Sequence, residues 1–201
     1  MVIIIDYGMG NIASVQKALF FLKVENVITR DLDTIKNSDI IILPGVGSFQ
    51  KGINNLNELG ISEVLNNEVL NNKKKFLGIC LGMQLLADKG NEPAPCKGLG
   101  WIKGEVKKFD VSGYRVPHMG WNNIEIHKDT YFNIGGNNDF YFIHSYHMVP
   151  EEKNVISATV DYGIKVVAAI QKENIFATQF HPEKSQIPGL AVLDSFLKSN
   201  A

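Results

Sequence analysis

The stretch from Phe76 to Gln84 constrains the fold of this chain more than any other. It is an apolar run that ends in the pattern Gly-x-Cys-x-Gly, and helix-forming residues follow at once. This pattern is typical of a nucleophile elbow, a sharp strand-to-helix turn that holds a reactive side chain above a sheet. Gly78 and Gly82 suit such a turn because a Cβ atom at either position would crowd it. Cys80 is therefore the candidate nucleophile of an acyl-transfer enzyme.

The residues after the elbow predict a helix over 81–89, with Gly90 as its C-cap. Cys80 would then lie at the positive end of the helix dipole, which favours a thiolate. The alternative interpretation is a small, buried, unreactive cysteine, which is common in apolar runs.

Short apolar runs alternate with helical patterns in the first half of the chain. The expected strands cover residues 2–6, 27–29, 39–43 and 76–80, and the expected helices cover 11–23 and 53–72. The second helix is predicted to break near Gly60. Continuous apolar strands separated by helices indicate a parallel sheet with helices on both faces.

The second half of the chain has a different character. From Gly98 to Ile170 it is rich in β-branched and aromatic residues, with a hairpin turn predicted at 161–163. A strand over 175–180 and an amphipathic helix over 190–198 follow. We expect a single α/β domain over residues 1–201, whose mostly parallel sheet carries an antiparallel β extension.

Composition excludes several classes of function. The formal net charge is -1, so no basic surface is expected to recruit nucleic acid. No apolar segment approaches the roughly 20 residues that cross a bilayer, and the run 2–5 is too short for a signal peptide. The two cysteines, Cys80 and Cys96, are expected to stay reduced in the cytoplasm.

A cysteine nucleophile needs a base near its sulfur and a group that orients the base. His181 and Glu183 supply both types directly after a predicted strand. The strand over 39–43 is followed by Pro-Gly-Val-Gly at 44–47. Because active sites of such sheets lie beyond the carboxyl ends of the strands, the three segments could converge.

A developing oxyanion needs hydrogen-bond donors. The amide of Leu81, next to the nucleophile, is one candidate, and the amide of Val46 after a flip of the Gly45–Val46 peptide is the other. A tight turn is the plainer interpretation of that glycine loop. No metal is expected at His118, His144 or His147, because they lack a close ligand spacing with a carboxylate or cysteine.

Two motifs resemble a known family. The segment 78–84, Gly-Ile-Cys-Leu-Gly-Met-Gln, and the segment 181–183, His-Pro-Glu, resemble the class I glutamine amidotransferases, which hydrolyse the side-chain amide of glutamine with a Cys-His-Glu triad. Within that family, five further segments are similar to the glutaminase subunits of imidazole glycerol phosphate synthase, an enzyme of histidine biosynthesis. These are 6–11, 44–49, 117–122, 142–146 and 181–185, so the resemblance covers essentially the whole chain.

The resemblance implies a flavodoxin-like fold and no cofactor. Cys80 would be the nucleophile, His181 the general base and then acid, and Glu183 the group that orients it. The oxyanion donors would be Val46 and Leu81. Residues at the glutamine-binding positions of the family are Gly45, Gly47, Gln84, Ser145 and Tyr146. Residues at the partner interface are Asn11, Met119, Trp121, Tyr141 and Lys184.

The implied partner is a (βα)8-barrel cyclase in a heterodimer. The glutaminase would hydrolyse L-glutamine to glutamate and pass ammonia to the cyclase, which would form imidazole glycerol phosphate and an aminoimidazole carboxamide ribonucleotide. One alternative is a paralogue that supplies ammonia to a different synthase, such as a nucleotide-sugar amidinating enzyme of surface-polysaccharide synthesis. Another is a non-catalytic regulatory subunit of the same fold.

Plainer interpretations stay open for three of these residues. Gln84 could face solvent on its helix, Trp121 could belong to the core, and Lys184 could be ordinary surface charge. The segment 91–97 departs from the family pattern, since it is short and holds two prolines and Cys96. We expect it to affect neither the triad nor glutamine binding, and we expect Cys96 to be inert.

Overall fold

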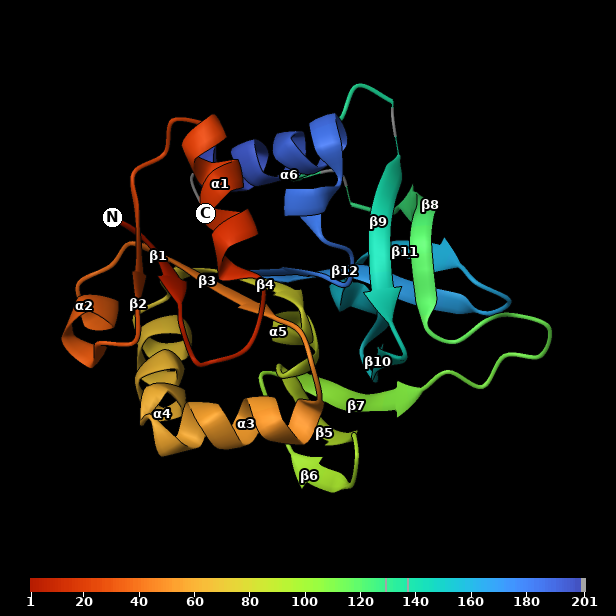
Figure 1. Ribbon diagram of the computed structural model, residues 1–201, viewed down its shortest axis with the longest axis horizontal. Coiled ribbons are helices and arrows are strands. Elements are labelled where there is room, and N and C mark those ends of the chain that lie inside the picture. The colour runs from red at the N-terminus through yellow and green to blue at the C-terminus, as the bar shows by residue number, and fades with distance from the viewer. Residues whose placement is uncertain (129, 137, 200–201) are drawn as a thin grey trace.

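One large sheet organises the computed structural model, which describes residues 1–128, 130–136 and 138–199 (Figure 1). Its strands are β1 (Val2–Ile5), β2 (Asn26–Thr29), β3 (Ile40–Gly45), β4 (Lys75–Cys80), β8 (His118–Ile126), β9 (Asp139–His144), β11 (Ile156–Asp161), β12 (Lys165–Lys172) and β13 (Ile175–Thr178). Their order is β2-β1-β3-β4-β13-β12-β11-β8-β9. The first five pair in parallel, and the other four extend the sheet in antiparallel fashion. The predicted sheet and its antiparallel extension are confirmed.

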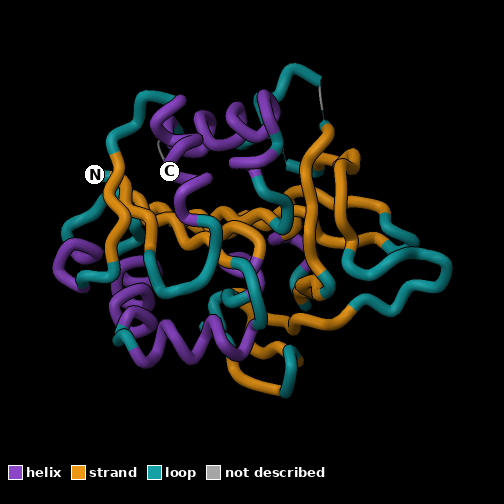
Figure 2. Tube along the Cα trace, in the orientation of Figure 1, coloured by secondary structure: helices purple, strands orange, loops and turns teal. Residues whose placement is uncertain are grey.

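Helices cover both faces of the parallel part (Figure 2). One face carries α1 (Ile12–Phe21) and α6 (Gln186–Lys198), and the other carries α2 (Leu32–Lys36), α3 (Phe49–Glu58), α4 (Ile61–Leu65) and a π-helical segment (Asn66–Asn71). Alternate strand residues therefore enter two separate cores. Ile4 packs in the core that contains Leu19 of α1, whereas Ile3 packs in the core that contains Leu56 of α3. This alternation follows from the two-residue repeat of a strand.

Several predicted boundaries are close to the observed ones. Asn11 caps α1 by accepting a hydrogen bond from the backbone of Ser14. Gly60 separates α3 from α4, as predicted, because its φ of 69° is in the left-handed region and ends the first helix. Gly163 has a φ of 75° in the predicted turn between β11 and β12. Within the part of the chain that the structure covers, no helix is long and apolar enough to cross a membrane.

The predicted helix over 81–89 is wrong. Helix α5 ends after one turn (Leu81–Gln84), and Gly90, the expected C-cap, lies within β5 (Ala87–Asn91). A Cβ atom on Gly90 would lie 2.6 Å from the ring of Phe49, so the glycine permits close packing of β5 under α3. The run from Leu85 to Ala87 is buried throughout, and such a run does not separate helix from strand by its period.

A second sheet contains this unexpected strand. Its order is β10-β7-β5-β6, where the remaining strands are β6 (Pro95–Lys97), β7 (Ile102–Lys108) and β10 (Tyr146–Pro150). In Figure 1 it lies below the large sheet, beside the end of α3. Two short 3-10 helices, Lys153–Val155 and Pro182–Lys184, complete the structure.

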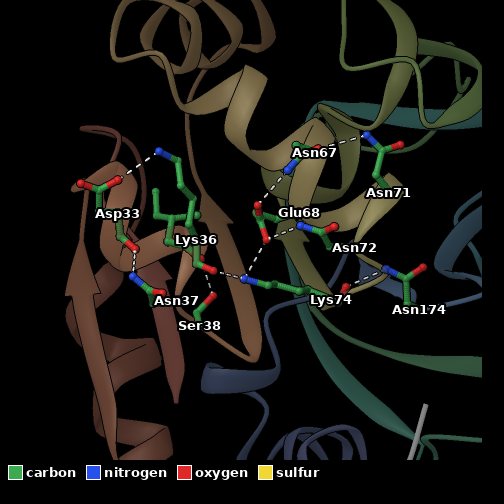
Figure 3. Close-up of polar contacts among 11 residues, drawn as sticks. Asp33, Lys36, Asn37, Ser38, Asn67, Glu68, Asn71, Asn72, Lys74 and Asn174 are labelled. Carbon is green, nitrogen blue, oxygen red and sulfur yellow. Dashed lines mark hydrogen bonds and ion pairs between the residues drawn. The ribbon is translucent and has the colours of Figure 1, made fainter.

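A buried carboxylate joins the π-helical segment to the start of β4 (Figure 3). Glu68 is almost fully buried and forms an ion pair of 2.7 Å with Lys74. Its carboxylate also accepts hydrogen bonds from Asn67 and Asn72, both at 3.0 Å. Burial opposes ionisation, but these contacts outweigh it and lower the pKa of Glu68. The cluster joins the helical layer to the N-terminal end of β4, the end opposite the elbow.

Replacing Glu68 with Gln should lower the free energy of unfolding at pH 7 by about 1–3 kcal/mol, because it removes the charge that pairs with Lys74 and leaves one acceptor oxygen where the carboxylate has two. A lowered folded-state pKa stabilises the protein above the unfolded pKa, about 4.3, and this contribution disappears as the pH falls. Urea unfolding of both proteins at several pH values measures the difference, which should shrink below about pH 4. If the difference in free energy of unfolding stayed constant with pH, ionised Glu68 would not be its source. Glu173→Gln, at the exposed pair with Lys73, is the control and should have a small effect.

Candidate active site

Cys80 lies at a strained turn, as the elbow pattern predicts. It is the last residue of β4 and has φ 55° and ψ -107°, a conformation that a residue with a side chain rarely adopts. A Cβ atom on Gly82 would lie 1.8 Å from the carbonyl oxygen of Leu43, and one on Gly78 would lie 2.8 Å from that of Gly82. Both glycines are therefore required by the close approach of β3, β4 and α5. Because α5 has only four residues, its dipole is smaller than the predicted helix would supply.

His181 and Glu183 form a buried pair at the end of β13. The Nδ1 atom of His181 lies 2.8 Å from Oε1 of Glu183, and both side chains are 2% exposed. Nδ1–H therefore donates to the carboxylate, which leaves Nε2 as the atom for proton exchange. Among the residues that the structure covers, Nε2 has no hydrogen-bond partner.

Electrostatics couple His181 to Cys80. Burial opposes protonation of the imidazole, but attraction by the Cys80 sulfur and the contact with Glu183 outweigh it, so the pKa of His181 is raised well above its usual range. Cys80 is 5% exposed, and its sulfur lies 3.7 Å from Nε2 of Gln179. Because β4 and β13 are parallel neighbours, the elbow and the His181–Glu183 pair lie at the same end of the sheet, as the predicted convergence requires.

A cavity of about 320 Å³ opens beside Cys80. The residues that line this cavity include Val46, Gly47, Cys80, Leu81, Gln84, Ser145 and Tyr146. All of these are residues that the sequence singled out. The cavity is large enough for a ligand the size of an amino acid.

The glycine loop lies next to the elbow because β3 and β4 pair in parallel. Gly45 is directly opposite Cys80 in that register. Val46 is 40% exposed, and Gly47 has a φ of 113° that favours glycine. A Cβ atom on Gly45 would lie 2.2 Å from the hydroxyl of Tyr7, so this position has no room for a side chain. The backbone of the loop can therefore approach the cavity closely.

Gln84 is buried, so the solvent-facing interpretation is wrong. It is 4% exposed, and its Nε2 donates to the carbonyl oxygen of Tyr146 at 2.8 Å and to Oε1 of Gln179 at 2.9 Å. The residue thus ties α5 to the cavity wall formed by Ser145 and Tyr146.

Segment 91–97, which we expected to affect neither the triad nor glutamine binding, contributes one residue to the cavity wall. Glu92 lines the cavity, and its Oε2 accepts a hydrogen bond of 3.2 Å from the backbone of Phe49. Burial raises the pKa of Glu92. Sequence reasoning missed it because the strand that carries the chain back to the cavity, β5, was predicted as helix.

Four of the five predicted interface residues gather on one surface. Met119 and Trp121 of β8 are 62% and 48% exposed, so the core interpretation of Trp121 is wrong. The ring of Trp121 lies 6.1 Å from that of Tyr141, and Nζ of Lys184 lies 5.8 Å from the Tyr141 ring. Asn11 is exposed at the start of α1.

The fold and this site define a class of protein. The sequence profile of the family described as Glutamine amidotransferase class-I matches residues 3–199, and the chain belongs to that family. It is 47% identical over 201 residues to "Imidazole glycerol phosphate synthase subunit HisH 1" of Campylobacter jejuni (strain RM1221), a match that covers 98% of this chain and 100% of that protein. It is 46% identical to subunit HisH of Pelagibacter ubique, with 98% of each chain covered.

Solved structures share the fold at lower sequence identity. "Crystal structure of glutamine amidotransferase" aligns with a TM-score of 0.74 at 19% identity and covers 98% of this chain and 99% of the other. "Structure of PurLQS from Thermotoga maritima" aligns with a TM-score of 0.73 at 20% identity, covering 98% and 96%. These similarities confirm the predicted fold class.

Replacing Cys80 with Ala should lower the pKa of His181, because attraction by Cys80 is the strongest influence that raises it. In the native chain the imidazolium should persist through neutral pH and be lost only as the pH rises through the raised value. Titration of the His181 ring followed by NMR measures both proteins. Cys96→Ala is the matched control and should leave the His181 titration unchanged. Identical titrations in the native and Cys80→Ala chains would contradict the coupling.

Proposed function

We propose that this chain is the glutaminase subunit of an imidazole glycerol phosphate synthase, acting as one glutamine amidotransferase domain over residues 1–201. The observation that carries the proposal is the buried His181–Glu183 pair coupled to Cys80, which lines an amino-acid-sized cavity. The full-length similarity to subunits named HisH supports the pathway. Both cysteines are free thiols, which agrees with an enzyme of the reducing cytoplasm.

The first chemical step is attack by the Cys80 thiolate on the side-chain amide carbon of glutamine. The negative charge that develops on the amide oxygen is stabilised by the backbone amide of Leu81 and, once its peptide is suitably turned, by that of Val46. His181 then gives its Nε2 proton to the amide nitrogen, the C–N bond breaks, and ammonia leaves. A γ-glutamyl thioester remains on Cys80.

The second step releases glutamate. His181, now neutral, takes a proton from water as the water oxygen attacks the thioester carbon. The C–S bond breaks, Cys80 leaves as thiolate and the imidazolium is restored. Glu183 acts throughout by accepting the Nδ1–H, which directs Nε2 toward the sulfur and stabilises the imidazolium.

The remaining cavity residues suit glutamine. Gly47 lines the cavity and Gly45 lies opposite Cys80, so the backbone of this loop can come close to the substrate. Gln84 braces the wall, and Ser145 and Tyr146 supply backbone polar groups. Glu92 adds a carboxylate, the natural partner for the α-ammonium group of the substrate.

Glu92→Gln should raise the KM for glutamine by about tenfold or more, because a charge-assisted contact with the substrate ammonium becomes a neutral one. The kcat should change little, since the triad is untouched. Steady-state kinetics of the full chain with its synthase measures both constants. The control is Glu105→Gln, at an ion pair with Lys107 on β7 away from the cavity. A KM equal to that of the control would remove Glu92 from substrate binding.

The partner is proposed to be a (βα)8-barrel cyclase that forms a heterodimer with this chain. Met119, Trp121 and Tyr141 present the aromatic and Met side chains that are enriched at interfaces, with Lys184 beside them. Asn11, exposed at the start of α1, is proposed to extend this interface. In "Imidazole glycerol phosphate synthase hisHF, chloroplastic" of Arabidopsis thaliana, the part that matches this chain is 34% of the length, so that protein carries its similar part within a longer chain.

A paralogue that feeds a different synthase is the second candidate. Methanococcus maripaludis has relatives named HisH 1 and HisH 2, at 44% and 42% identity, so two proteins of this kind occur in one organism. The complete Cys80, His181 and Glu183 set favours an enzyme over a non-catalytic regulatory subunit.

The full chain should hydrolyse glutamine slowly alone and faster with the histidine-pathway cyclase and its nucleotide ligand, whereas Cys80→Ala should abolish hydrolysis and still bind the cyclase. Ammonia release and co-purification measure the two properties. Acceleration by a nucleotide-sugar amidinating enzyme instead would assign the paralogous function. Hydrolysis retained by Cys80→Ala would exclude Cys80 as the nucleophile.

A further inference from the structure

Two buried histidines lie side by side next to the cavity, and the triad does not use them. Nδ1 of His118 on β8 is 3.1 Å from Nε2 of His144 on β9, and the two residues are directly opposite each other in the strand register. The His118 ring is stacked on Phe142 at 4.7 Å and on Tyr162 at 4.0 Å. Its position is therefore fixed by packing.

The proton positions of this pair follow from its neighbours. Nδ1 of His144 is 2.8 Å from the carbonyl oxygen of Tyr146, which can only accept, so Nδ1 of His144 carries a proton. Burial lowers the pKa of His144 to about 3 and that of His118 to about 4, so both rings are neutral at pH 7. Nε2 of His144 must then accept from Nδ1–H of His118. Nε2 of His118 in turn faces the amide nitrogen of Asn122 at 3.4 Å.

The chain of hydrogen bonds continues to the nucleophile. The carbonyl oxygen of Tyr146 that accepts from His144 also accepts from Gln84 at 2.8 Å. Gln84 donates its second proton to Gln179 at 2.9 Å, and the amide of Gln179 lies 3.7 Å from the sulfur of Cys80. A continuous series of polar contacts therefore joins Asn122 to Cys80, in which the Tyr146 carbonyl accepts from His144 on one side and from Gln84 on the other.

The series of hydrogen bonds begins on β8, the strand that also carries the exposed side chains of Met119 and Trp121. Along β8, His118 and Asn122 point inward, while the intervening Met119 and Trp121 are exposed. Figure 1 shows β8 and β9 side by side at the end of the molecule away from α2. A contact that shifts β8 against β9 would therefore alter the His118–His144 hydrogen bond. Through His144 it would also move the Tyr146 carbonyl, which accepts a hydrogen bond from Gln84.

We propose that His118 and His144 are positioning residues that hold the Ser145–Tyr146 wall and Gln84 in the geometry that binds glutamine, and that they link this wall to the exposed face of β8. The inference rests on the proposed glutaminase function. It requires one tautomer of each ring, with the proton on Nδ1.

The test compares three variants of the full chain with its synthase. His118→Phe keeps a stacked ring but removes the donor, so the KM for glutamine should rise about fivefold with kcat nearly unchanged. His118→Asn can put its amide nitrogen where Nδ1 was and should restore a KM close to the native value. His147→Phe is the control. His147 is buried nearby and stacks on Phe109 at 4.9 Å, but it is not one of the residues in the series of hydrogen bonds from Asn122 to Cys80. Equal KM values for His118→Phe and His147→Phe would overturn the proposal.

Nitrogen-15 NMR of the native chain gives a second test that needs no variant and no activity. Both His118 and His144 should be neutral at pH 7 with the proton on Nδ1. A proton on Nε2 of either ring, or a charged ring, would overturn the proposal even if His118→Phe failed to fold. A native protein that shows these tautomers but no hydrolysis of glutamine would instead contradict the proposed function.

Discussion

The close packing of β3, β4 and α5 is the constraint on which the rest of the site depends. Gly82 lies so near the carbonyl oxygen of Leu43 that no side chain fits between them. This contact forces Cys80 into its left-handed turn and sets it opposite Gly45 at the end of the neighbouring strand. The reactive sulfur and the glycine loop are therefore adjacent because of backbone packing, before any side-chain interaction is considered.

The electrostatics of the site build on that geometry. Glu183 fixes the ring of His181 through Nδ1, and the remaining nitrogen shares a buried environment with Cys80. In such surroundings a charge is stabilised only by a partner of opposite sign, so the protonation of His181 depends on the sulfur and on Glu183. On the other side of the cavity, His118 and His144 are held neutral by burial, which lets them act as directional hydrogen-bond groups rather than as charges.

The sequence predicts the parallel part of this fold well because its signals are local. Apolar runs, the Gly-x-Cys-x-Gly turn and Gly60 each describe a conformation within a few residues. The same reasoning singled out Cys80, His181 and Glu183, since Cys80 ends β4 and the other two lie shortly after the end of the parallel neighbour β13.

The parts that sequence reasoning missed depend on long-range packing. The residues from Leu85 to Ala87 are buried on every side, so their pattern carries no helical or strand period, and β5 was mistaken for helix. For the same reason, Glu92 was not predicted as a residue of the site. The burial of Gln84 could not be predicted because it depends on Tyr146 and Gln179, which are distant in sequence. The second sheet arises from the same distant pairings.

Mass spectrometry of the acid-quenched enzyme shows directly whether Cys80 carries the acyl intermediate. The full chain with its synthase is mixed with glutamine, quenched within one turnover and digested. We expect a γ-glutamyl group on the peptide that contains Cys80, and none on Cys96 or in Cys80→Ala. Hydrolysis of glutamine without that adduct, or an adduct on Cys96, would contradict this expectation.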